Sequence, residues 1–112
     1  MEYNGKNLKT IGEVFDMALK LAKTDKKEAR NFFNKYINWI SMYNHYSWDK
    51  ATEIAKSNFG YFAGYFDPKV CDLIYNTYQC SHPIFGDKPF DVDPEDAYKK
   101  GLEIGMKLKN KG

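Results

Sequence analysis

The sequence predicts an all-α fold, a compact bundle of about five helices with one long ordered loop over residues 80–92. Three observations lead to this prediction. Apolar residues recur every three or four positions in five stretches, which is the period of one helix face. Residues that cap helix N-termini stand directly before those stretches. No segment alternates apolar and polar residues for long, so we expect no major strand.

The expected helices begin at recognisable N-terminal signals. They cover residues 11–23, 26–44, 48–65, a stretch that starts at Asp67-Pro68, and 94–109. Thr10 and Asp25 each precede a glutamate by three positions, which is the spacing of a capping box. Ser47 is a further N-cap, and the Asp-Pro pairs place proline at the first helical position.

One domain is expected over residues 10–109, with flexible ends. The 112-residue length suits a single domain. Residues 1–9 and 110–112 are mostly polar, so we expect both segments to be flexible. Within the third stretch, Asp49, Glu53 and Lys56 lie opposite the apolar face.

Charge and hydropathy argue against several classes of partner. The net charge is +2 and Arg30 is the only arginine, so the guanidinium contacts typical of specific nucleic-acid readers are missing. No apolar run approaches the ~20 residues of a membrane span, and the polar N-terminus does not resemble a signal peptide. We therefore expect a cytoplasmic protein that binds neither specific nucleic acid nor membrane. Cys71 and Cys80 are expected to be reduced, because a helix would hold them about 13 Å apart.

Small residues in two of the helices make a surface without bulk. Gly60 and Gly64 lie four apart in NFGYFAGYF, and Gly101 and Gly105 repeat that spacing in the last helix. Glycine in a helix costs about 1 kcal/mol relative to alanine, so its repeated use indicates close approach of another backbone. A shallow, aromatic-walled groove for a partner or a ligand is the alternative. We expect residues 80–86 to pack on the Gly60–Gly64 surface, because one stretch offers bulk where the other lacks it.

The loop over residues 80–92 carries side chains that also occur in active sites. Cys80, His82 and Asp87 support an alternative in which a small enzyme or ligand-binding protein uses a pocket under this loop. Zinc is not expected, because a structural site needs four ligands and only Cys80 and His82 have suitable local spacing. That spacing is also not diagnostic of a Cys–His nucleophile pair. We expect neither a metal nor a cofactor.

Three motifs carry a resemblance. Residues 58–65 read NFGYFAGY, residues 80–86 read CSHPIFG, and Pro94-Glu95-Asp96-Ala97 follows with Gly101. With these motifs the chain resembles small all-helical proteins of gut Firmicutes, their phages and mobile elements. The resemblance covers about residues 10–105 and implies a helical fold and a bacterial or phage setting. It carries over no catalytic or binding residue.

The composition favours a non-enzymatic binding module over an enzyme. The aromatic share is 17% and no complete catalytic set is present, while tyrosine and tryptophan are enriched among interface hot spots. We expect a protein-protein interaction or regulatory role with a protein partner, and a homo-oligomer subunit is the remaining alternative. The expected binding residues are Tyr61, Tyr65, Tyr75, His82 and Phe85.

Overall fold

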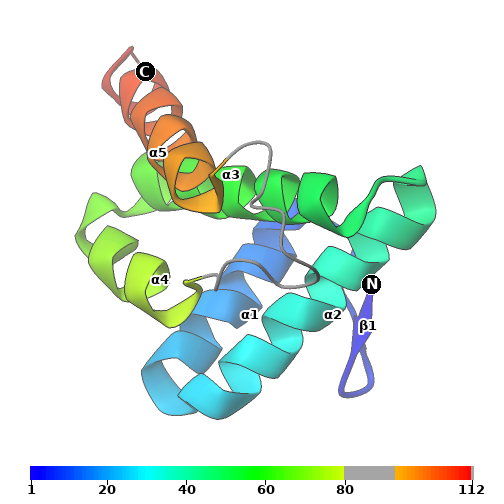
Figure 1. The fold of residues 1–112 in the computed structure, drawn as a ribbon. Helices are drawn as coiled ribbons and strands as arrows, with labels where there is room; N and C mark the ends of the chain where they lie inside the picture. Colours follow the sequence, from blue (N-terminus) through cyan, green and yellow to red (C-terminus); the bar gives the residue numbers. More distant parts are fainter. Residues whose placement is uncertain (80–92, 112) are drawn as a thin grey trace.

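The computed structural model describes residues 1–79 and 93–111 (Figure 1). The helices are α1 (Ile11–Thr24), α2 (Lys26–Asn44), α3 (Trp48–Phe66), α4 (Cys71–Thr77) and α5 (Pro94–Lys111). A 3₁₀ turn, η1 (Pro68–Val70), joins α3 to α4, and strands β1 (Glu2–Tyr3) and β2 (Lys6–Asn7) form a short N-terminal hairpin. The prediction of an all-α fold with about five helices is confirmed. The loop expected over residues 80–92 lies outside the described residues.

The N-termini of α1, α2 and α3 are capped by the side chains that the sequence predicts. Thr10 Oγ1 accepts a hydrogen bond from the N–H of Glu13 at 3.1 Å, and Asp25 Oδ1 accepts one from Glu28 at 3.1 Å. Ser47 caps α3 in the same way. Each bond satisfies an N–H that has no partner within its own helix, so these residues determine where the helices begin.

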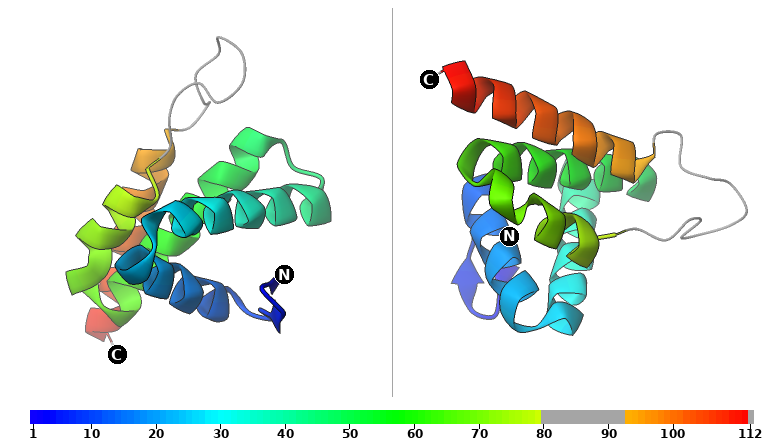
Figure 2. Two further views of the ribbon diagram at one scale, coloured as in Figure 1. Left: turned by 90° about the horizontal axis from the view of Figure 1, so that it is seen from below. Right: turned by 90° about the vertical axis from the view of Figure 1, so that its left-hand side faces the viewer.

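Helix α3 is the middle layer of the molecule. Figure 2 shows α5 along one side of α3, with α1, α2 and α4 on the other side. Helix α5 packs mainly on α3 and more lightly on α4. The contact with α3 therefore decides where α5 lies.

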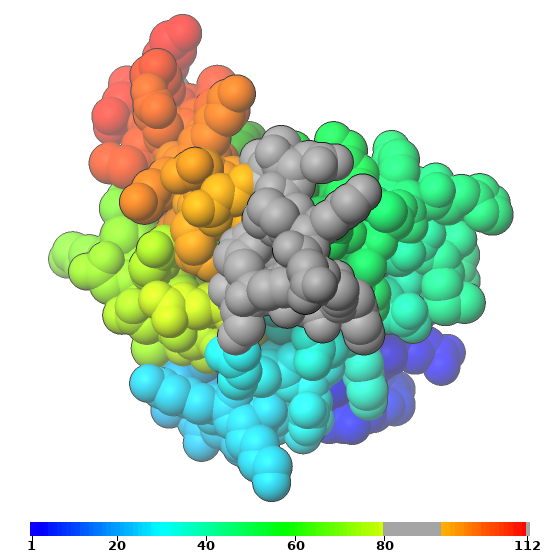
Figure 3. All heavy atoms as spheres, in the orientation of Figure 1, coloured from blue at the N-terminus to red at the C-terminus, as the bar shows by residue number. Residues whose placement is uncertain are grey.

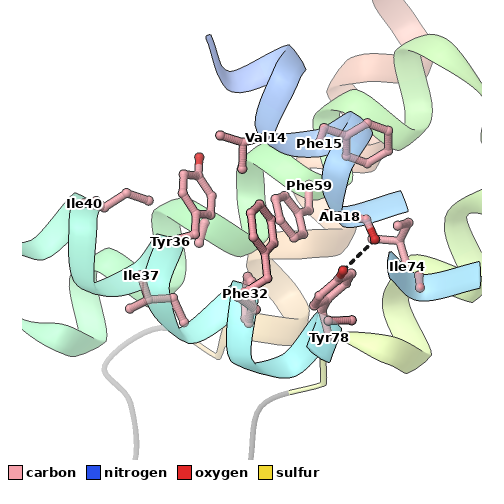
Figure 4. Close-up of a cluster of buried hydrophobic side chains, with 14 of the residues drawn as sticks. Val14, Phe15, Ala18, Phe32, Tyr36, Ile37, Ile40, Phe59, Ile74 and Tyr78 are labelled. Carbon is pink, nitrogen blue, oxygen red and sulfur yellow. Dashed lines mark hydrogen bonds between the residues drawn. The ribbon is translucent and has the colours of Figure 1, made fainter. Parts of the chain in front are cut away.

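A cluster of aromatic rings fills the space between α1, α2, α3 and α4. Phe59 lies at its centre, with ring centroids 5.2 Å from Phe33, 5.6 Å from Tyr36 and 6.0 Å from Phe15. Figure 4 shows Phe59 among side chains from several helices. Aromatic pairs at such distances add about 0.5–1.5 kcal/mol each to the gain from burying their surface, so the contacts among these rings stabilise the core.

Tyr78 joins the end of α4 to α1. Its hydroxyl donates a hydrogen bond to the carbonyl oxygen of Ala18 at 2.6 Å (Figure 4), and its ring lies 5.2 Å from that of Phe59. Burial raises the pKa of Tyr78 above its ordinary value, because a phenolate there would lose its hydration. The residue therefore stays neutral and acts as a donor inside the core.

The N-terminal hairpin differs from the flexible segment that was expected over residues 1–9. Tyr3 and Leu8 are buried, and the ring of Tyr3 meets that of Phe32 edge-on at 4.8 Å. Asn4 and Gly5 have positive φ angles of 49° and 81°, which is the backbone of a tight hairpin turn. Asn-Gly is a strong hairpin signal, but the two-residue strands beside it are too short to show an alternating pattern.

Helices α2 and α3 are the longest in the fold, with 19 residues each. Charged residues interrupt both of them. Within residues 1–79 and 93–111, no helix has the combined length and apolarity that a bilayer crossing requires.

Candidate functional site

The glycines of α3 let the backbone of α5 approach directly. A β-carbon added to Gly60 would fall within 3.0 Å of the carbonyl oxygen of Tyr98, and one added to Gly64 would fall equally close to that of Leu102. Because the later glycine meets the later residue, the two helices run in the same direction. Any side chain at either position would collide with backbone rather than with a movable side chain.

The glycines of α5 in turn let the backbone of α3 approach. A β-carbon added to Gly101 would overlap the carbonyl oxygen of Ser57, and one added to Gly105 would overlap that of Tyr61. All four glycines of the motif are buried. Close helix–helix packing, the first interpretation of the glycine spacing, is therefore confirmed.

Residues 80–86 lie outside the described residues, but the Gly60–Gly64 surface on which they were expected to pack is already occupied. The space over both glycines is taken by the backbone of α5, so no bulky side chain fits there. The spacing predicted the close approach correctly, but it does not identify the approaching segment. Gly101 and Gly105 were the better match, because small residues on both helices are needed for backbones to touch.

Apolar side chains remain exposed beside this crossing, and we call them the α3–α5 patch. Its members are Tyr61 and Tyr65 from α3 and Ile104 and Leu108 from α5. Tyr61 is half-buried, and the other three are between 41% and 46% exposed. Phe66 borders the patch through Tyr65, but it stacks on Phe62 on the side of α3 that faces α1. Gly105 brings the two sets together, because it touches the backbone of Tyr61 and Tyr65 and stands between Ile104 and Leu108 along α5.

The aromatic part of the patch is ordered by ring contacts. The rings of Tyr61 and Tyr65 are stacked, with centroids 6.1 Å apart and planes only 9° from parallel. Phe66 meets Tyr65 edge-on at 5.1 Å. In the space-filling view, the C-terminal half of α5 projects at one corner of the molecule (Figure 3). The patch thus combines rigid rings with half-exposed aliphatic side chains.

Tyr75 does not join Tyr61 and Tyr65. It lies in α4, where its ring meets that of Tyr98 at 5.5 Å, and it helps to line a hollow of about 350 Å³ between α4 and α5. Cys71 lines the same hollow, and burial together with Asp72 raises the pKa of its thiol. A raised pKa lowers the thiolate fraction, so this cysteine is not activated as a nucleophile.

Lys56 is buried, although the sequence places it opposite the apolar face of its helix. Its Nζ donates to the carbonyl oxygen of Tyr78 at 2.7 Å and pairs with Glu95 Oε2 at 3.1 Å. The rings of Tyr75 and Tyr98 lie 5.5 Å and 5.2 Å from the same nitrogen. Helix α5 covers this side of α3, which the helical period of α3 alone does not reveal. These contacts link α3 to the chain on both sides of residues 80–92.

Two expected binding residues, His82 and Phe85, lie outside the described residues. The same holds for Cys80 and Asp87, on which the enzyme alternative depends. Among residues 1–79 and 93–111, no group of three or more His, Cys, Asp or Glu side chains is placed to hold a metal ion.

A second exposed cluster lies at the end of α2. Met42 and Tyr43 are 65% and 72% exposed, and the ring of Tyr43 lies 5.0 Å from that of Trp39. The last turn of α2 carries no basic residue. The cluster is therefore an exposed apolar surface without the lysines of α5, and a substitution in it is a control for one in the α3–α5 patch.

Comparison of the chain with protein-family models, curated proteins and solved structures finds no match.

Proposed function

We propose that the chain is a non-enzymatic helical binding module that holds a protein partner on the α3–α5 patch. The observation that carries the proposal is the stacked pair Tyr61 and Tyr65 beside Ile104 and Leu108, half-exposed on two helices in backbone contact. Tyrosine is favoured at interface hot spots, because it offers a large contact area with few rotatable bonds. A regulatory role in the cytoplasm of a bacterium, or of a phage-infected cell, is the setting we propose with it.

The rigidity of the helix pair supports this role. Patch residues on regular helices need little ordering when a partner binds, so less free energy is lost on association. Catalysis has weaker support. Among residues 1–79 and 93–111 no group of three or more His, Cys, Asp or Glu side chains is placed to hold a metal ion, and the thiol of Cys71, which lies beside Asp72, has a raised pKa.

The proposal is tested by recovery of a partner that depends on the patch. Tagged wild-type protein, a Tyr65→Ala/Ile104→Ser variant and a Tyr43→Ala control are incubated with lysate of the organism that encodes the chain. Quantitative mass spectrometry then compares the bound proteins. We expect at least one protein to be lost with the patch variant and retained by the control, and its purified form to rebind the wild type.

Two outcomes would contradict the assignment of binding to the α3–α5 patch. If every recovered protein binds the patch variant as well as it binds the wild type, the patch is not the binding surface. Loss of the same proteins with Tyr43→Ala would instead assign binding to the α2 cluster.

A further inference from the structure

The charges around the α3–α5 patch are unevenly distributed. Residues 99–111 of α5 contain five lysines against one glutamate. Lys100, Lys107 and Lys111 lie three or four positions from Ile104 or Leu108, so they are their neighbours on the helix surface. All three lysines are exposed. The apolar side chains of α5 are therefore edged by positive charge.

The single glutamate changes this little. Glu103 pairs with Lys107 at 3.1 Å, but the two side chains are 65% and 70% exposed. Ion pairs of this kind are largely screened by water and contribute little. Lys111 appears in no ion pair among the described residues, so its charge is available to a partner. Lys100 is also in none of these ion pairs, but it lines a hollow together with Glu53 and Asp96, which offset part of its charge.

We propose that the occupant of the α3–α5 patch is an acidic amphipathic helix of a partner protein. The inference rests on the proposed function and names the chemistry of its partner. Apolar side chains of such a helix, three or four positions apart, would lie on Tyr65, Ile104 and Leu108. Its flanking carboxylates would face Lys100, Lys107 and Lys111, which steers the encounter and fixes the orientation.

A second copy of the chain fits the same surface less well. A symmetric dimer brings the same patch of both copies together, so the lysine edge of one copy would lie close to that of the other. Like charges close to an interface disfavour association.

An anionic membrane also fits less well. A helix at a membrane surface buries its apolar face about 5–10 Å into the headgroup boundary. Ile104 and Leu108 are only 46% and 43% exposed, because their own protein covers the remainder. Side chains covered to this extent suit a partner of complementary shape better than they suit insertion into lipid.

The test is a selection with charge-altered variants. Helical peptides from a random display library are selected on the wild type, and their affinities are measured for four proteins. These are the wild type, Tyr65→Ala, a Lys100→Gln/Lys107→Gln/Lys111→Gln triple variant and a Lys20→Gln/Lys23→Gln/Lys27→Gln control on α1 and α2. We expect the selected peptides to be acidic and amphipathic, and to bind the α5 triple variant about tenfold more weakly. The control should bind them as the wild type does.

The outcomes separate this inference from the function on which it rests. If the selected peptides need Tyr65 but are neutral or basic, or ignore the α5 lysines, the acidic partner is refuted and the binding function stands. If no selected peptide depends on Tyr65, both proposals fail. Light scattering and co-sedimentation with phosphatidylserine vesicles complete the test. A dimer or vesicle binding that disappears with Tyr65→Ala would overturn the acidic helix as the occupant.

Discussion

The carbonyl oxygen of Tyr98 lies so close to Gly60 that a β-carbon at residue 60 would overlap it. The relationship is reciprocal, because Gly101 leaves the corresponding space for the carbonyl oxygen of Ser57. Each glycine disfavours its own helix by about 1 kcal/mol. The two helices regain this through many additional contacts between their backbones, each of them small.

We expect Gly60→Ala to destabilise the protein. Alanine favours the helix by about 1 kcal/mol, but the added carbon collides with backbone that cannot move aside without separating α3 from α5. Overpacking of this kind costs typically 1–3 kcal/mol or more, so we expect a net loss of about 2 kcal/mol. Urea unfolding followed by circular dichroism measures the change.

Gly12→Ala is the matched control for that substitution. Gly12 also lies in a helix, but a β-carbon there would be 3.7 Å from Thr10 Oγ1 and 3.8 Å from a ring carbon of Phe62, which are ordinary contacts. We expect this variant to be as stable as the wild type or slightly more stable. If Gly60→Ala unfolds at the same urea concentration as Gly12→Ala, the crossing is looser than described.

The helices could be predicted from the sequence because their signals are local. The caps at Thr10, Asp25 and Ser47 and the apolar periods lie within each helix, so no knowledge of tertiary contacts was needed. The partner of the Gly60–Gly64 surface was not predictable in this way. It depends on which distant segment supplies a second small-residue face, and spacing in one helix carries no such information.

The burial of Lys56 leads to a second prediction. Its ammonium group is fully buried, and its Nζ lies 3.1 Å from Oε2 of Glu95, which supplies the opposite charge. Glu95→Gln removes that charge and leaves the ammonium group in a site of low polarity. Breaking a buried pair is strongly destabilising, although Glu95 itself is 19% exposed, so we expect a loss of about 2 kcal/mol in urea unfolding.

Two further variants make this prediction specific. Glu103→Gln breaks a pair of the same length on the exposed face of α5 and should change stability by less than about 0.5 kcal/mol. Adding Lys56→Met to Glu95→Gln should restore part of the loss, because the buried charge is then removed as well. Equal effects of Glu95→Gln and Glu103→Gln would show that Lys56 is hydrated.

The residues of the α3–α5 patch were only partly predictable. Of the three tyrosines named from the sequence, Tyr61 and Tyr65 belong to the α3–α5 patch. Tyr75 does not, because it lies in α4 and packs on Tyr98. Ile104 and Leu108 were missed because they carry no chemical signature. Their exposure follows from α5 having α3 as its main neighbour, which is a property of the assembled fold.

The patch should be dispensable for folding, which is our third prediction. Tyr65 and Ile104 are 41% and 46% exposed, so Tyr65→Ala/Ile104→Ser removes side chains that are only partly packed. We expect a loss of about 1 kcal/mol and an unchanged circular-dichroism spectrum. By contrast, Tyr78→Phe removes a buried hydroxyl that donates to the carbonyl oxygen of Ala18 at 2.6 Å. Although only one oxygen atom is lost, we expect the free energy of unfolding to fall at least as much as in the patch variant. A patch variant that unfolds at room temperature would contradict the exposed position of these residues.

The N-terminal hairpin predicts a dependence of stability on alkaline pH. The Tyr3 hydroxyl donates to Glu28, and burial together with that carboxylate raises the pKa of Tyr3 from 10.0 to about 12. The folded protein therefore holds this proton between about pH 10 and 12, while the unfolded chain releases it. Stability contributed by Tyr3 is complete below pH 10 and is lost as the pH rises towards 12.

Tyr3→Phe isolates this effect. The variant should be less stable than the wild type by about 1 kcal/mol at pH 8, because the hydrogen bond to Glu28 is gone. Between about pH 10 and 12 its unfolding free energy should fall less steeply, because it has no proton to release at this site. Tyr43→Phe, at a ring that is 72% exposed, should follow the wild type throughout. Parallel curves for Tyr3→Phe and the wild type would mean that the hairpin is detached from α2 in solution, since only contact with Glu28 and the core gives Tyr3 its raised pKa.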